Sequence, residues 1–263
     1  MRILVAGLPR SGTTYLYSII LNAIPGGFAA LFEPTPELLN KATDVYRAST
    51  ANGIVKIVLT SSEYVKHYAH FNKNILLVRD PRDNLISTLL YSTLHCNFIR
   101  DPNKKSEFLA LLRKKEQDPK SVTMQELIAV RDKLEGGDFI VELEEQRQIS
   151  LSYHAQNPNL FVFSYNDLVE HKLKPLEDYL GFQLNVKVEV PQMYSRVRRA
   201  ARSVDWPDWF LAEDLTYFKP LYQDYLNLYR LSDDWAARET MKIEPRECSE
   251  YVEKLINEAL IGT

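Results

Sequence analysis

The residues with the clearest chemical meaning stand near the start of the chain, in the segment Gly7-Leu-Pro-Arg-Ser-Gly12 and the Thr13-Thr14 pair after it. An apolar run at residues 3–6 predicts a buried strand before this segment, and Thr13 opens a predicted helix. Free backbone N–H groups and the positive end of the helix dipole meet at such a junction, which favours an anion. Arg10 adds a cation within the loop. The segment predicts a site for a phosphate-bearing ligand; a tight turn without a ligand is the alternative.

The spacing of Gly7 and Gly12 is that of a nucleoside-triphosphate loop, G-x-x-x-x-G, but Thr13 stands where the loop's lysine should follow. We therefore expect a ligand whose terminal group is not a γ-phosphate. A small-molecule kinase or another P-loop nucleotide-binding protein is the alternative that this departure argues against.

A second pair of residues suited to phosphate follows the clearest strand pattern, residues 74–79. Arg79 ends that run, and Ser87 stands eight positions later in a helix that Asp80-Pro81 should start. A guanidinium and a hydroxyl placed in this way can bind one phosphate from two directions. A structural ion pair between Arg79 and a neighbouring aspartate is the alternative.

Strand-length apolar runs alternate with helical patterns, and this predicts a single α/β domain with a central parallel sheet and helices on both faces. Ligands of such sheets bind beyond the carboxyl ends of the strands. We thus expect one cleft, surrounded by the segments that follow five positions: Ala6, Phe32, Leu59, Val78 and Phe163.

Composition limits the class of protein. The 263 residues suit one domain over 1–263, and the net charge of −3 argues against a nucleic-acid-coating protein. No apolar run reaches the length of a membrane span, and Cys96 and Cys248 suit a reducing compartment, so a cytoplasmic location is expected. Residues 98–137 read as a charged helical insertion, either a solvated helical pair or a lid over the cleft.

Taken together, Pro9-Arg10-Ser11-Gly12-Thr13-Thr14 and Arg79…Ser87 resemble the two signatures of sulfotransferases that use 3′-phosphoadenosine 5′-phosphosulfate (PAPS). The resemblance implies a P-loop-like sulfotransferase fold. It also implies that the loop binds the 5′-phosphosulfate and that Arg79 and Ser87 bind the 3′-phosphate.

The resemblance covers residues 1–97 and about 158–210, and further residues within these ranges match the family less closely. Tyr165 lies in a stretch similar to the family's Y-E-D-L and would face the adenine, and Tyr15 replaces an aromatic residue that stacks near it. Arg198 and Arg199 are similar to a late basic segment that reaches the 3′-phosphate.

The resemblance also implies catalytic residues. Lys56 aligns with a lysine that meets the bridging oxygen, but the histidine of the cytosolic branch is absent, since Val58 stands two positions later. The Glu33-Pro34 pair after the second strand is similar to the carbohydrate and bacterial branches, so Glu33 is the preferred base. A solvated loop carboxylate is the alternative.

The four histidines His67, His70, His95 and His154 match no family position, but one of them remains the alternative source of a base. The expected reaction moves a sulfuryl group from PAPS to a hydroxyl or amine of a small-molecule acceptor, without a metal, a nucleic acid or a membrane. A carbohydrate, a phenol and a natural-product amine or alcohol all remain possible acceptors. Acidic residues between 138 and 145 suit a cationic acceptor or simply form a solvated helix face.

Overall fold

The computed structural model describes residues 1–24, 28–48, 52–186 and 204–261. The chain divides into two compact units, the first from residues 1–79 and 143–195 and the second from residues 80–142 and 196–263. Compactness does not decide how many domains fold independently, so the single domain over 1–263 stays a prediction.

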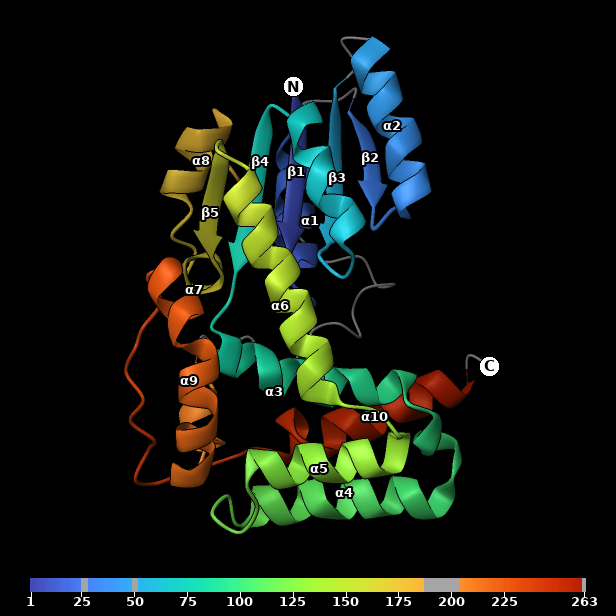
Figure 1. The fold of residues 1–263 in the computed structure, drawn as a ribbon, viewed down its shortest axis with the longest axis vertical. Helices are drawn as coiled ribbons and strands as arrows, with labels where there is room; N and C mark the ends of the chain where they lie inside the picture. The colour runs from blue at the N-terminus through green and yellow to red at the C-terminus, as the bar shows by residue number, and fades with distance from the viewer. Residues whose placement is uncertain (25–27, 49–51, 187–203, 262–263) are drawn as a thin grey trace. The chain divides into compact units, whose positions relative to one another are not determined.

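The first unit is built on a five-stranded sheet in which every pairing is parallel and the strand order is β2-β3-β1-β4-β5 (Figure 1). The predicted central parallel sheet is therefore confirmed. Its strands are β1 (Arg2–Gly7), β2 (Ala29–Phe32), β3 (Gly53–Val58), β4 (Lys73–Val78) and β5 (Leu160–Ser164). Because all five run the same way, their carboxyl ends lie at one edge.

Apolar residues cover both faces of the central strands, as a sheet packed between helices requires. Ile3 and Val5 of β1 pack on one face with Leu16 and Ile20 of the helix α1 and with Leu176 of α8. The helices of this unit are α1 (Thr13–Ala23), α2 (Pro36–Ala48), the 3-10 helix η1 (Ser62–His70), α7 (Tyr165–Val169), α8 (Lys174–Leu180) and most of α6 (Phe139–Gln156).

The opposite face of the sheet carries the alternate residues of the same strands, among them Leu4 and Ala6, which are fully buried. In Figure 1 η1 and α6 lie in front of the sheet and α1 lies behind it. The rings of Tyr68 on η1 and Tyr153 on α6 meet edge to face with centroids 6.5 Å apart. Helices thus flank the sheet on both faces, as the sequence predicted.

The second unit is built from helices and connecting loops, with no strand among its described residues. Its longer helices are α3 (Pro81–Ser92), α4 (Pro102–Gln117), α5 (Met124–Glu135), α9 (Ala212–Leu228) and α10 (Ser249–Ile261). Short 3-10 helices join them: η2 (Thr93–His95), η3 (Asn97–Arg100), η5 (Trp206–Asp208) and η6 (Pro245–Glu247).

Polar side chains fix the helix starts of this unit. The Asp80 carboxylate caps α3 by accepting from the Arg82 amide at 2.9 Å, and it also pairs with the buried Arg82 guanidinium. Thr123 and Glu126 form a capping box at the start of α5.

Residues 98–137 comprise η3, α4 and α5, and their role as a lid stays a prediction. No helix in the described part of the chain combines the length and apolarity of a membrane span.

Candidate active site

The loop between β1 and α1 leaves the sheet at the carboxyl edge, and two glycines allow its path. A Cβ at Gly7 would lie 2.8 Å from the Leu77 carbonyl oxygen and 2.6 Å from Ser11 Oγ. Gly12 has a φ of 92°, a left-handed conformation that L side chains rarely adopt. Only glycine lets the loop lie this close to β4 and then turn into α1.

The loop is closed by its own hydrogen bonds and ends at an open helix terminus. Ser11 donates from its amide and its hydroxyl to the Leu8 carbonyl, at 3.2 and 2.7 Å. Gly12 is the N-cap residue of α1, and within the described residues no side-chain hydrogen bond caps this end of the helix. The uncapped start of α1 lies at the positive end of the helix dipole, an arrangement that suits an anion.

Lys56 lies on β3 and contacts both the first turn of α1 and the residues at the end of β2. Its Nζ donates to Thr14 Oγ1 at 3.3 Å, forms an ion pair with Glu33 and lies 4.5 Å from the centroid of the Phe32 ring. The Lys56 side chain is 2% exposed, whereas that of Glu33 is 47% exposed. The structure thus brings both predicted catalytic residues together beside the loop.

Electrostatics at Lys56 reflect this burial. Desolvation lowers the pKa of the Lys56 ammonium from its ordinary value, the hydrogen bond and charge of Glu33 act in the opposite direction, and the positive charge of Arg10 lowers the pKa further. Glu33 therefore helps to keep a buried ammonium charged, and Arg10 is close enough for its charge to act on the same group.

The backbone at Glu33 is strained and held from two directions. Its φ of 47° is unusual for a residue with a side chain. The Glu33 amide donates to the Lys56 carbonyl at 2.9 Å, and the Tyr64 hydroxyl donates to the carbonyl of Pro34 at 3.0 Å. Burial and the nearby charge of Glu33 raise the pKa of the Tyr64 phenol, so it stays a donor at neutral pH.

Arg79 reaches the loop from the end of β4. It is 7% exposed, its Nη1 donates to the Arg10 carbonyl at 2.9 Å, and its guanidinium lies 4.4 Å from the centroid of the Tyr165 ring. Its Nε is buried without a hydrogen-bond partner among the described residues. Asp80, the neighbouring aspartate that could have formed an ion pair with Arg79, pairs with Arg82. A buried guanidinium with an unused N–H suits an acceptor such as a phosphate oxygen.

The remaining residues predicted to contact the donor lie in the loop, in α1, in the second unit and outside the described residues. Pro9 lies in the loop, and the Tyr15 hydroxyl contacts the Val186 carbonyl at 3.5 Å. Ser87 is buried in α3, in the second unit, so its partnership with Arg79 stays a prediction. Arg198 and Arg199 lie outside the described residues.

Sequence reasoning missed three contacts: the Lys56–Glu33 pair, the Tyr64–Pro34 hydrogen bond and the packing of Tyr165 on the loop. The first of them follows from the pairing of the strands. Phe32 lies opposite Lys56 in the β2–β3 register, so the next residue, Glu33, emerges beside Lys56. That register was not readable before the strands were paired.

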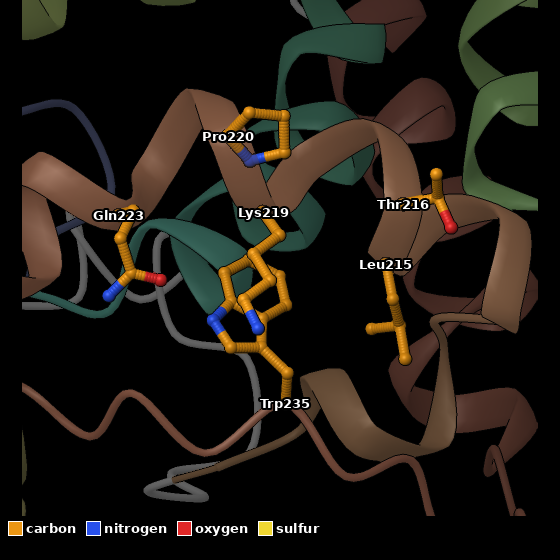
Figure 2. Close-up of a pocket in the computed structure, with 6 residues that line it drawn as sticks. All are labelled: Leu215, Thr216, Lys219, Pro220, Gln223 and Trp235. Carbon is orange, nitrogen blue, oxygen red and sulfur yellow. The ribbon is translucent and has the colours of Figure 1, made fainter.

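A separate hollow of about 600 Å³ lies in the second unit (Figure 2). Leu215, Thr216, Lys219, Pro220 and Gln223 of α9 line it together with Trp235. None of the predicted site residues that the structure describes lines this hollow. In the described part of the chain no group of histidine, cysteine and carboxylate side chains has the arrangement of a metal site.

No protein-family model and no curated protein sequence matches this chain. Among solved structures, the crystal structure of the mouse sulfotransferase SULT7A1 complexed with PAP is similar, with a TM-score of 0.53 and 17% sequence identity. The likeness covers 88% of this chain and 86% of the mouse chain. With its central parallel sheet flanked by helices, the chain therefore has the P-loop-like α/β fold of the sulfotransferases.

Proposed function

We propose that this chain is a sulfotransferase that moves a sulfuryl group from PAPS to a hydroxyl or amine of a small-molecule acceptor. One observation carries the proposal: buried Lys56 bonds both to Thr14, in the first turn of α1 directly after the loop, and to the carboxylate of Glu33. A cation and a base thus stand side by side where the donor's phosphosulfate would bind. The shared fold with a PAP-bound sulfotransferase supports the same conclusion.

The residues present fit a donor that carries phosphate groups. Gly7 and Gly12 allow the backbone to approach an anion closely, and Arg79 has a buried N–H that lacks an acceptor among the described residues. Residues 9–14 would hold the 5′-phosphosulfate, and Arg79 the 3′-phosphate. Ser87, Tyr165, Tyr15, Arg198 and Arg199 keep their predicted roles as further donor contacts.

The chemistry divides between the two catalytic residues. The donor supplies an activated sulfuryl group when it is bound. The Lys56 ammonium offers a fixed positive charge to the phosphate oxygen on which negative charge builds during transfer. The Glu33 carboxylate, half exposed and therefore accessible to an acceptor, takes the proton that the acceptor hydroxyl or amine loses.

Donor binding tests the proposal without knowledge of the acceptor. We expect calorimetry to show binding of 3′-phosphoadenosine 5′-phosphate (PAP) with an affinity that does not depend on magnesium. ATP should bind with lower affinity. A bound ligand must also raise the melting temperature, because it stabilises only the folded state. Tighter binding of ATP, a requirement for magnesium or no binding of PAP would contradict the proposal.

A further inference from the structure

The ring of Tyr165 packs against the anion loop. A Cβ placed on Gly12 would lie 2.7 and 2.8 Å from Tyr165 Cδ2 and Cε2, so the ring edge occupies the space that any side chain at this position would need. Tyr165 begins α7 directly after β5, and Ser164 caps that short helix by accepting from the Asn166 amide at 3.1 Å. The ring is thus delivered to the loop from a fixed strand end.

Arg79 completes the contact from the neighbouring strand. Its guanidinium lies over the face of the same ring, and its Nη1 binds the carbonyl of Arg10. Arg10 has a φ of 63°, a conformation that costs energy for a residue with a side chain and so must be imposed by its surroundings. The hydrogen bond from Arg79 fixes the direction of the carbonyl that this conformation presents.

We infer that Arg79 and Tyr165 act together as a clamp that holds the loop at residues 8–12 in its anion-binding conformation. The inference rests on the proposed function, since the loop's ligand is taken to be a nucleotide phosphosulfate. It gives Tyr165 a positioning role at the loop in addition to any contact with the adenine. It also gives Arg79 a second task beside its proposed contact with the 3′-phosphate.

The clamp has a consequence for specificity. One guanidinium is bonded to the loop through Nη1 and, through its remaining N–H groups, would meet the 3′-phosphate. A ligand that occupies the 3′ position therefore also fixes the group that orders the loop. A ligand with both anionic groups should bind with a free energy more favourable than the sum of the two separate contacts, because the cost of ordering the loop is met only once.

The test uses adenosine 5′-phosphosulfate, which reaches the loop but has no 3′-phosphate, with PAP as the second ligand. We expect Tyr165→Ala and Arg79→Ala each to weaken binding of adenosine 5′-phosphosulfate by about 10-fold, the loss typical of one charge-assisted or cation–π contact. Tyr165→Phe keeps the ring and should stay within about 2-fold of the parent. The double variant should lose little more than either single one, because the two residues act as a unit.

A matched control separates the clamp from general packing. Phe161 is also an aromatic residue of the β5 region, and it stacks on Tyr179 with centroids 4.4 Å apart, within the unit's apolar cluster. Phe161→Ala should lower stability without changing the affinity of the folded protein for adenosine 5′-phosphosulfate. Hydrogen exchange of the loop amides in the ligand-free protein should accelerate in Tyr165→Ala and Arg79→Ala but not in Tyr165→Phe or Phe161→Ala.

The outcomes are distinguishable. If Arg79→Ala weakens PAP and leaves adenosine 5′-phosphosulfate unchanged, Arg79 is a 3′-phosphate ligand alone and the clamp is wrong. If the parent binds neither nucleotide, the proposed function fails, and loop exchange alone then decides the clamp. Unchanged exchange in Tyr165→Ala would overturn it.

Discussion

Replacing Glu33 by glutamine should destabilise the protein by an amount that depends on pH in a specific way. Two unit charges about 4 Å apart attract by about 4 kcal/mol at an effective dielectric constant of about 20. Because the Glu33 side chain is 47% exposed, solvent screens much of this attraction, and we expect a loss of about 1 kcal/mol at neutral pH. Lys56 keeps its contacts with Thr14 and Phe32, which limits the loss.

The pH dependence follows from the direction of the Lys56 shift. Burial lowers the pKa of Lys56 below 10.5, and Glu33 opposes this, so removing Glu33 lowers the pKa further. Below the folded-state pKa the ammonium is charged and the pair contributes its full stability. As the pH rises through the folded-state pKa, which lies below 10.5, the buried amine becomes neutral and the contribution of the pair is lost. The cost of Glu33→Gln should therefore shrink towards zero as the pH rises through this window.

Urea denaturation of both proteins at neutral pH and near pH 10.5 measures this difference. Glu37→Gln is the matched control, because Glu37 is an exposed carboxylate in the first turn of α2, away from Lys56 in the sequence and outside its ion pair. Its small effect on the free energy of unfolding should not vary with pH. A cost for Glu33→Gln that is equally independent of pH would refute the coupling of Glu33 to Lys56.

The same variant tests catalysis once a screen of acceptors, read by mass detection, provides an assay. If Glu33 is the base, turnover should fall by about 10²–10⁴-fold while donor affinity does not fall, since a carboxylate offers nothing to an anionic donor. Near-parental turnover across the pH range would remove Glu33 from the mechanism and return attention to the histidines.

Two further changes have defined outcomes. Gly7→Ala places a Cβ 2.8 Å from the Leu77 carbonyl oxygen of β4, a backbone atom that cannot move aside. The free energy of unfolding, measured with urea, should fall by about 1–3 kcal/mol, and PAP binding should weaken. A variant as stable as the parent would contradict the close approach of the loop to β4. Lys115 is fully buried against the carbonyls of Pro119 and Val122, and desolvation lowers its pKa to about 8. Between pH 8 and pH 10.5 the unfolded chain therefore binds more protons than the folded chain. The free energy of unfolding of the parent should rise over this range relative to that of Lys115→Met, and two free energies that change in parallel with pH would contradict this.

Much of the fold was predictable because its signals are local. The strand ends expected at Ala6, Phe32, Leu59, Val78 and Phe163 lie within one residue of the ends of β1 to β5, since apolar strands bounded by polar turns are recognisable along the chain. Asp80 caps α3 as the Asp80-Pro81 pair indicated. The order β2-β3-β1-β4-β5 was not predicted, because it depends on which strands pair across the sheet.

Within the candidate site, the sequence by itself determined the loop, since glycines at 7 and 12 between a strand and a helix are a property of consecutive residues. The apolar pattern also placed Arg79 at the end of a strand, and the resemblance to known motifs named Glu33 and Lys56 as catalytic residues. Only the tertiary structure decided that Lys56 pairs with Glu33 and that Arg79 and Tyr165 contact the loop and each other. These contacts join residues 23 to 153 positions apart, so they exist only once parallel pairing brings separate strand ends to one edge.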